Sequence, residues 1–220
     1  MYTVIIAHAP NLDLAPYLEH IRTADLLIAA DGGALPLLRA NILPHIAVGD
    51  FDSLDTVHEQ YLIEQNVEVQ HFPRAKDETD LELALMLAAQ RGANTIDILG
   101  ALGGRWDHTL ANVALLDHPT LRDRQVRLLA DQQTLFLVRD TVTITGQKGD
   151  TISLLPLTGT VHGVTTEGLL YPLRQAILHY EQARGISNVL ITPPGLVRIK
   201  TGLLLIVHHD DGGAHQWNTG

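Results

Sequence analysis

The sequence predicts an α/β protein in which a mostly parallel αβα sheet domain is followed by an antiparallel β-sandwich domain. Up to about Asp131, short apolar runs alternate with helical patterns, which is typical of βαβ units. Beyond that point the runs are short and strand-like, and turns that contain Gly and Pro separate them. With 220 residues, 45% hydrophobic and 18% charged, the chain is large enough to bury two cores.

In the first domain, each short apolar run predicts a strand, and helical patterns occupy the intervals. The strands are expected at Thr3–Ala7, Leu26–Ala30, Ile46–Val48, Val67–His71, Thr95–Leu99 and Val126–Ala130. The helices are expected at Leu14–Arg22, Ala34–Ala40, Leu54–Gln65, Asp80–Arg91 and Leu110–Leu116. The Leu/Ala stripe of the helix that begins at Asp80 is interpreted as core.

The second domain is expected to contain short antiparallel strands. They are expected at Thr134–Val138, Val142–Thr145, Thr151–Pro156, Thr160–Val164, Val189–Thr192, Leu196–Ile199 and Leu203–His208. Leu173–Leu178 has a helical pattern. We therefore expect an α/β domain over residues 1–131, a β-sandwich over 132–210 and a flexible, polar, Gly-rich tail over 211–220.

Composition excludes several classes of protein. The formal net charge is −10 and no basic stripe is visible, which argues against nucleic-acid binding. The chain has no cysteine, so disulfides and thiolate metal sites are excluded. The N-terminal run is interpreted as a strand rather than a signal peptide, and no stretch has the roughly 20 apolar residues of a membrane-spanning helix. We expect a cytoplasmic protein that does not bind membranes.

Carboxylates follow four of the predicted strands in the first domain. Ligands of open α/β sheets bind beyond the carboxyl ends of the strands, so these groups are expected to share one edge of the sheet. The segments concerned are Asp31-Gly32-Gly33, Gly49–Ser53, Arg74–Asp80 and Gly100–Asp107.

Asp50 and Asp52 are the first candidate metal ligands. If the segment is extended, side chains at i and i+2 point the same way, and two such carboxylates suit Mg²⁺. An interpretation of equal weight is that Asp52 or Ser53 caps the next helix.

Asp80 and the glycine-rich loop each fit a structural interpretation as well. Asp80 is expected in the first turn of a helix, where the helix dipole alone favours it, and Thr79 is the expected N-cap. The loop Gly100–Asp107 allows close backbone approach, and Arg105 matches phosphate oxygens. Alternatively it is a flexible turn in which Asp107 is the N-cap.

A run of His and Asp near the C-terminus has two interpretations. His208-His209-Asp210-Asp211 could bind a metal ion, but a solvated strand end is the favoured interpretation.

Five motifs together resemble the thiamine pyrophosphokinase family, from about Val4 to Val207. They are Asp31-Gly32-Gly33-Ala34, Gly49-Asp50-Phe51-Asp52-Ser53, Lys76-Asp77-Glu78-Thr79-Asp80, Gly103-Gly104-Arg105-Trp106-Asp107-His108 and Ser187-Asn188. Two features depart from the family pattern: His8-Ala9-Pro10 replaces a glycine-containing turn, and Tyr171 stands where many members have tryptophan.

The resemblance implies roles for individual residues. Asp50, Asp52 and Asp80 would hold Mg²⁺ and, with Arg105, act in catalysis. The ATP site would include Asp31, Gly32, Lys76, Thr79, Arg105, Asp107, Thr109 and Asn112. Thiamine would contact Ser187, Asn188 and Tyr171. The resemblance also implies a homodimer with active sites at the subunit interface.

The reaction implied is an in-line attack by the hydroxyl of thiamine on the β-phosphorus of ATP, which releases AMP. Arg105, with Lys76 or Arg74, would balance the charge on the transferred group. Three alternatives are a pterin diphosphokinase, a non-catalytic nucleotide or thiamine sensor, and, from Asp50-Phe51-Asp52 alone, a glycosyltransferase.

Overall fold

The chain divides into two compact units, Met1–Asp131 and Gln132–Gly220. The structure is a computed structural model that describes residues 1–9, 11–73 and 75–211. Pro10 of the predicted His8-Ala9-Pro10 turn, Arg74 and all but the first residue of the expected flexible tail therefore lie outside the described residues. Each unit is described here by itself.

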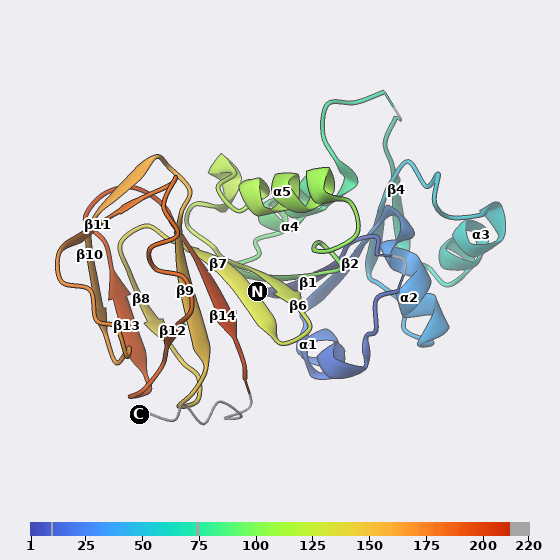
Figure 1. Ribbon diagram of the computed structural model, residues 1–220. Helices are drawn as coiled ribbons and strands as arrows, with labels where there is room; N and C mark the ends of the chain where they lie inside the picture. The colour runs from blue at the N-terminus through green and yellow to red at the C-terminus, as the bar shows by residue number, and fades with distance from the viewer. Residues whose placement is uncertain (10, 74, 212–220) are drawn as a thin grey trace. The chain divides into compact units, whose positions relative to one another are not determined.

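The first unit contains a parallel sheet (Figure 1). Its strands are β1 (Tyr2–Ile6), β2 (Leu26–Ala30), β3 (Ile46–Gly49), β4 (Glu68–His71), β5 (Thr95–Leu99) and β6 (Gln125–Ala130), in the order β6-β5-β1-β2-β3-β4. All neighbouring pairs in this series are parallel, which confirms the predicted class. The order reverses between β5 and β1, and ligands of such sheets bind beside this point.

Helices cover both faces of this sheet. They are α1 (Leu18–Thr23), α2 (Ala34–Arg39), α3 (Thr56–Glu64), α4 (Asp80–Gln90) and α5 (Trp106–Leu115), with short 3₁₀ turns η1 (Ala15–Tyr17), η2 (Asp31–Gly33) and η3 (Pro119–Leu121). The buried leucines and alanines of α4 pack on β1, β2 and β3, and α1 lies on the opposite face (Figure 1). The Leu/Ala stripe is therefore core, as predicted.

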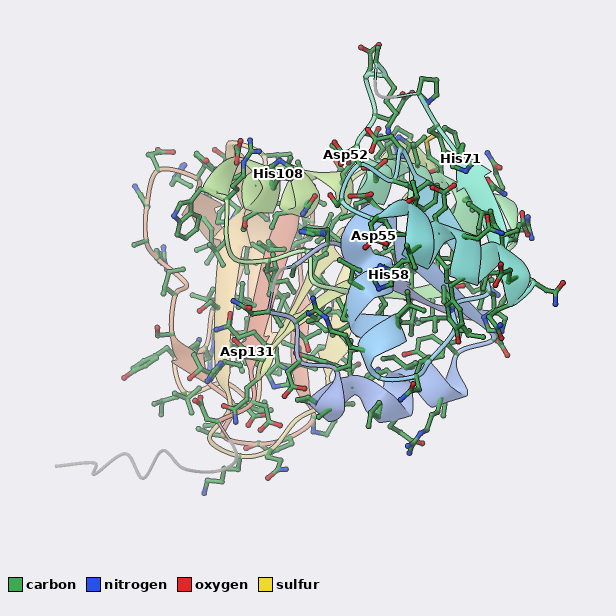
Figure 2. All side chains as sticks on the ribbon, turned by 90° about the vertical axis from the view of Figure 1, so that its right-hand side faces the viewer. Asp52, Asp55, His58, His71, His108 and Asp131 are labelled. Atoms are coloured by element: carbon green, nitrogen blue, oxygen red, sulfur yellow. The ribbon has the colours of Figure 1, made fainter. Side chains whose placement is uncertain are left out.

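Two helix starts matter for the site. Asp55 caps α3: its Oδ1 accepts from the His58 backbone N–H at 2.9 Å, and the two side chains lie together (Figure 2). α5 begins at Trp106 rather than at Leu110, with Arg105 as its N-cap. Asp107 is consequently in the first turn, and its predicted alternative role as N-cap is wrong. None of the residues of α5 is buried. Core-facing apolar residues therefore do not indicate, in the sequence, where this helix begins.

The second unit is an antiparallel sandwich. One sheet has the neighbours β12 (Asn188–Val189), β9 (Thr151–Pro156), β14 (Leu204–His209) and β7 (Gln133–Val138). The other has β11 (Ala176–His179), β10 (Thr160–Glu167), β13 (Gly195–Arg198) and β8 (Thr141–Ile144). Inward-facing aliphatic side chains from both sheets form one hydrophobic cluster.

The helical pattern over Leu173–Leu178 is a wrong prediction. The segment is a loop followed by β11, which pairs with β10. The backbone N–H of Leu173 donates to the Thr166 hydroxyl at 2.8 Å, and its carbonyl accepts from the Thr166 N–H at 3.0 Å. These contacts use the backbone groups that a helix would need. Across the described ranges, none of the helices is long and apolar enough to cross a membrane.

Candidate active site

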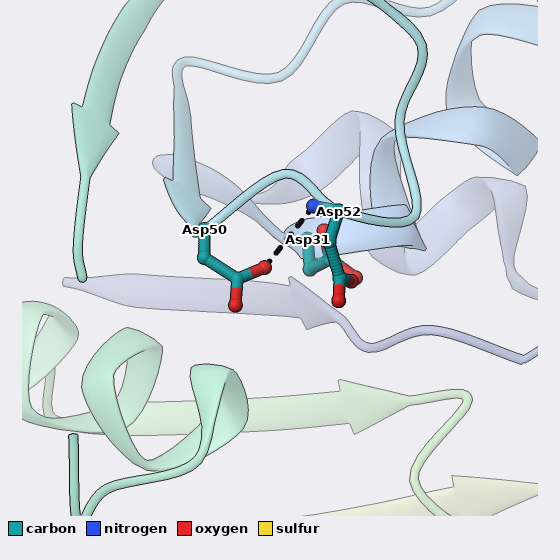
Figure 3. Close-up of side chains that lie close together, drawn as sticks. All are labelled: Asp31, Asp50 and Asp52. Atoms are coloured by element: carbon teal, nitrogen blue, oxygen red, sulfur yellow. Dashed lines mark hydrogen bonds between the residues drawn. The ribbon is translucent and has the colours of Figure 1, made fainter. Parts of the chain in front are cut away.

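Three aspartates from two adjacent strand ends converge on one point. Asp31 follows β2, and Asp50 and Asp52 follow β3. Each offers a carboxylate oxygen, and the three oxygens all lie within 4.8 Å of one another (Figure 3). This is the edge of the sheet at which the sequence placed the carboxylates.

Asp31 is the buried member of this acidic trio. It is 6% exposed, and among the described residues its Oδ1 has no hydrogen-bond partner. Its backbone is in the left-handed region with φ 46°, a conformation that Asp and Asn tolerate better than most residues. A buried, unpaired carboxylate oxygen is costly unless a proton or a cation satisfies it.

Another buried carboxylate shows how this unit satisfies such a group without a ligand. Asp97 in β5 is fully buried, yet it accepts from Arg127 Nε at 2.6 Å and Nη2 at 2.7 Å. The Tyr2 hydroxyl also donates to it at 2.8 Å, and His20 Nδ1 lies 3.0 Å away. Burial and the hydrogen bond to Asp97 raise the pKa of the Tyr2 hydroxyl. Asp31, by contrast, lies close to two other carboxylates.

Asp50 and Asp52 converge through a turn, and the predicted extended segment is wrong. Phe51 between them has φ 54°, in the left-handed region. The Asp52 backbone N–H donates to Asp50 Oδ1 at 3.1 Å, so the first carboxylate closes the turn that carries the second (Figure 3). Ser53 Oγ donates to Asp52 Oδ1 at 3.2 Å.

The acidic trio fits a divalent cation with oxygen ligands. At an effective dielectric constant near 20, like charges about 4–5 Å apart repel by roughly 3–4 kcal/mol per pair. Mg²⁺ takes oxygen ligands from carboxylates, waters and phosphates, and the trio offers carboxylate oxygens of this kind. The buried, unpartnered oxygen of Asp31 is the observation that favours a cation here over a chance grouping of acidic residues.

Asp80, the third predicted metal ligand, is outside this group in the described chain. It is the first residue of α4, and its Oδ1 accepts from Lys76 Nζ at 2.8 Å. The Lys76 side chain is only 10% exposed. Thr79 is the N-cap, as predicted, and its hydroxyl accepts from the Glu82 N–H at 3.2 Å. Lys76 and Asp80 thus form an ion pair at the start of α4.

The glycine-rich loop between β5 and α5 is held by its own polar residues. Arg105 Nε donates to Asp107 Oδ1 at 3.1 Å, and its Nη2 donates to Oδ2. The Arg105 hydrogen bonds lower the pKa of Asp107 to about 2, and both side chains are exposed. Thr109 Oγ1 donates to the Gly103 carbonyl at 3.2 Å, and Asn112 Nδ2 to the Ala101 carbonyl at 2.8 Å.

Two glycines allow close contacts near the point where the strand order reverses. A Cβ on Gly100, which has φ 74°, would lie 2.5 Å from the Ala7 carbonyl oxygen. A Cβ on Gly32 would lie 1.7 Å from His8 Nδ1. The exposed His8 side chain therefore occupies the space over the backbone next to Asp31. In the sequence, His8 directly follows the predicted strand Thr3–Ala7, but no motif assigned it a role.

In the second unit, the predicted thiamine residues lie close together. Asn188 is 4% exposed, and its amide accepts from the Tyr171 N–H at 3.0 Å and donates to the Tyr171 carbonyl at 2.8 Å. The Tyr171 side chain is 63% exposed. Ser187 precedes Asn188 with φ 56°, and its N–H donates to Ser153 Oγ at 3.0 Å.

The histidines at the end of β14 have carboxylate partners. His208 Nε2 lies 2.8 Å from Asp150 Oδ2, and its side chain is 15% exposed, so the favoured solvated strand end does not describe it. His209 Nε2 lies 3.1 Å from Asp211 Oδ1. Within the residues that the structure places, neither pair is part of a group of three or more metal-ligating side chains.

Two family models match the chain. "Thiamin pyrophosphokinase, catalytic domain" matches residues 17–130, and "Thiamin pyrophosphokinase, vitamin B1 binding domain" matches residues 140–204. The chain belongs to the thiamin pyrophosphokinase family. The resemblance found in the sequence motifs is thereby confirmed.

Relatives of this family align over nearly the whole chain. Thiamine pyrophosphokinase from Bacillus subtilis is 35% identical over 214 residues, covering 94% of this chain and 98% of that protein. The crystal structure of the Bacillus subtilis enzyme has a TM-score of 0.84 at 30% identity, covering 96% of this chain and 100% of the other. Yeast thiamin pyrophosphokinase, at 17% identity and a TM-score of 0.80 over 94% and 86% of the two chains, shares the fold.

Proposed function

We propose that the chain transfers the diphosphate group of ATP to the hydroxyl of thiamine and releases AMP, with Mg²⁺ held by the acidic trio. The observation that carries the site assignment is the convergence of Asp31, Asp50 and Asp52, with one buried Asp31 oxygen unpartnered among the described residues. Membership of the family supports the reaction. The first unit is the proposed catalytic domain and the second the thiamine-binding domain.

The acidic trio is the proposed core of the metal site, and Asp80 remains the predicted additional carboxylate. When bound, Mg²⁺ supplies charge neutralisation for the trio and the ATP phosphates. Lys76 holds Asp80 in place at the start of α4. This ion pair has no net charge, so the neutralisation of a polyphosphate is left to Mg²⁺ and to other cationic side chains.

Arg105 is the proposed contact for the phosphate groups. Its guanidinium has five N–H donors, and Asp107 accepts from two of its nitrogens, so about three donors remain for phosphate oxygens. The two hydrogen bonds to Asp107 also fix the plane of the Arg105 guanidinium before a ligand binds. Less conformational entropy is then lost when the phosphate binds. Gly32, Thr79, Thr109 and Asn112 remain predicted nucleotide-site residues.

Tyr171 is the proposed aromatic contact for thiamine. Its ring is exposed, while the Asn188 side chain hydrogen-bonds to both its backbone N–H and its backbone carbonyl. The ring therefore extends from a fixed segment of backbone. The thiazolium of thiamine is cationic, and a cation over an aromatic face gains roughly 0.5–2 kcal/mol. Ser187 remains a predicted neighbour of the bound substrate.

The homodimer with active sites at the subunit interface also remains a proposal. Exposed apolar side chains on the described part of α5 support it: Trp106 is 78% exposed and Leu110 is 66% exposed, one helical turn apart. Large exposed apolar side chains on one helix face are typical of interaction surfaces. Light scattering should give a dimer for the wild type and a monomer for Trp106→Glu/Leu110→Glu. The cytoplasmic location also remains a prediction.

Product analysis tests the reaction directly. The protein is incubated with ATP, Mg²⁺ and either thiamine or a hydroxymethyl pterin, and the products are identified by mass spectrometry. Thiamine diphosphate and AMP are expected in the incubation with thiamine, and no AMP is expected in the incubation with the pterin. AMP formed only with the pterin would identify the alternative diphosphokinase, and no AMP with either alcohol would identify a sensor. Asp50→Asn should abolish turnover, whereas Asp55→Asn, which keeps the α3 cap, should not.

A further inference from the structure

The turn that carries Asp50 and Asp52 is strained at the residue between them. Phe51 has φ 54°, and a non-glycine residue in the left-handed region costs roughly 1–2 kcal/mol. Such conformations persist where the surrounding structure fixes them, and they cluster at functional sites. Contacts of the Phe51 side chain must therefore hold the turn in the form that joins its two carboxylates to Asp31.

Two sets of contacts hold Phe51. Its side chain is 5% exposed and belongs to the hydrophobic cluster that includes Leu54 and Leu62. On another side, the ring of His71 meets it edge-on, with centroids 4.9 Å apart and planes at 68°. Aromatic pairs in this arrangement gain roughly 0.5–1.5 kcal/mol beyond their buried area. This is similar in size to the cost of the strained backbone.

His71 is itself fixed at two points. It is the last residue of β4, where it pairs with Gly49, the residue just before the acidic turn. Its Nε2 lies 3.0 Å from Oε1 of Glu59, which belongs to α3, the helix just after the turn. His71 is thus tied to the chain before the segment that carries Asp50 and Asp52 by its backbone, and to the chain after it by its imidazole. Figure 2 shows His71 and Asp52 in the same part of the unit.

We propose that His71 is a positioning residue, which acts through Phe51 to hold the Asp50–Asp52 turn in its metal-binding form. The inference rests on the proposed metal site and adds to it a residue that is not one of the three metal-ligating aspartates. The His71 side chain is 57% exposed, so it contributes little to the core. Its position matters because the three carboxylates repel one another and would separate if the turn could relax.

Loss of His71 should therefore weaken metal binding without unfolding the protein. Residues that orient metal ligands from outside typically cost 10–100-fold in metal affinity when removed. His71→Ala should raise the half-saturating Mg²⁺ concentration for AMP formation about tenfold, with kcat at saturating Mg²⁺ nearly unchanged. His71→Phe, which keeps an aromatic edge against Phe51, should stay within about twofold of the wild type.

His58→Ala is the matched control. His58 is also exposed, at 43%, and also pairs with a carboxylate of the same region, Asp55, whereas the aromatic contact of Phe51 in the described chain is with His71. Its metal response should match the wild type. Phe51→Leu provides the second test: if His71 acts through the Phe51 ring, then adding His71→Ala to Phe51→Leu should have no further effect on metal affinity.

The experiment titrates each purified variant with Mn²⁺ by electron paramagnetic resonance and with Mg²⁺ in the AMP assay, and measures thermal unfolding without metal. A tenfold weaker Mn²⁺ affinity for His71→Ala alone, with the unfolding temperature lowered by no more than about 2–4 °C as expected for the loss of one ring contact, supports the proposal. Unchanged Mn²⁺ affinity in His71→Ala, an equal loss in His58→Ala, or full additivity with Phe51→Leu overturns it. Absence of AMP from the wild type would instead contradict the proposed function, and the Mn²⁺ titration would still decide the role of His71.

Should His71→Ala fail to fold, the His71→Gln variant, which keeps a polar group near Glu59 without the ring, takes its place.

Discussion

The side chain of Asn188 pairs with the backbone of Tyr171 as a neighbouring strand would. Its Oδ1 accepts from the Tyr171 N–H at 3.0 Å, and its Nδ2 donates to the Tyr171 carbonyl at 2.8 Å. The same Oδ1 accepts from the Val189 N–H at 2.9 Å. Asn188 is buried, so it is better placed to fix Tyr171 than to touch a substrate itself. This refines the role that the family resemblance implies for Asn188.

Asn188→Ala should therefore act through Tyr171. Three backbone groups lose this partner: the N–H and carbonyl of Tyr171 and the N–H of Val189. Each group left unsatisfied costs roughly 1–3 kcal/mol, so the free energy of unfolding should fall by about 3 kcal/mol or more. The KM for thiamine should rise while the KM for ATP stays constant. Urea denaturation and steady-state kinetics measure the two effects. Tyr180→Ala, which removes another exposed tyrosine of the same unit, is the control. An unchanged KM for thiamine would show that Asn188 is important for folding alone.

Asp31→Asn should separate metal binding from folding. Asn also tolerates the left-handed backbone, so the turn is kept, while one charge of the acidic trio is removed. Because repulsion within the trio is reduced, the free energy of unfolding without metal should be equal to that of the wild type or higher. The wild type should gain unfolding temperature as Mg²⁺ is added, because a ligand of the native state stabilises it. Asp31→Asn should lose this gain and Asp55→Asn should keep it. An equal Mg²⁺ shift in Asp31→Asn would exclude Asp31 as a ligand.

Strand and helix periodicity predicted much of this fold because each unit has its own core. β2, β5 and β9 match their predicted ranges, since a buried strand appears in the sequence as an uninterrupted or alternating apolar run. The helical pattern over Leu173–Leu178 failed because a partner distant in sequence, Thr166, decides its backbone pairing. Contacts of that kind leave no local signal.

The acidic edge of the sheet was predictable, but the membership of the acidic trio was not. Strand ends of a parallel sheet meet at one edge, so the sequence could gather Asp31, Asp50, Asp52 and Asp80 there. Which of them approach one another depends on two left-handed residues, Asp31 and Phe51, and on the ion pair that Asp80 makes with Lys76. A non-glycine residue with positive φ has no reliable sequence signature. The part that His71 plays could only be seen once its ring was placed against Phe51.

Gly100→Ala should destabilise the first unit more than an ordinary glycine substitution. A Cβ there meets the Ala7 carbonyl oxygen at 2.5 Å, and φ 74° is itself unfavourable for alanine. Gly92, with φ 87° and open space around its Cβ, isolates the backbone cost. We expect Gly92→Ala to lower the free energy of unfolding by about 1 kcal/mol and Gly100→Ala by roughly 2–4 kcal/mol. Urea denaturation checks both values. Equal losses would show that β1 and its loop can move away from Gly100 at no cost.

The Arg105–Asp107 pair should persist to acidic pH. Its hydrogen bonds lower the pKa of Asp107 from 3.8 to about 2, so the pair is fully present above pH 4 and is lost as the pH falls through about 2. A carboxyl ¹³C NMR titration checks this, and pH 3 is already decisive. There a group of pKa 2 is about 90% ionised, whereas one of pKa 3.8 is about 14% ionised.

Arg105→Ala should raise the pKa of Asp107 toward 3.8, with the hydrogen bond from the His108 backbone N–H still in place. In the wild type, 1 M NaCl should also raise this pKa, because both side chains are exposed and salt screens them. A wild-type Asp107 that is mostly protonated at pH 3 would contradict the pairing. If the pair holds, Asp107 keeps its charge throughout the pH range from 4 to 9. Any change of activity within that range must then come from another group, and the guanidinium of Arg105, the proposed phosphate contact, would meet ATP with its orientation already set.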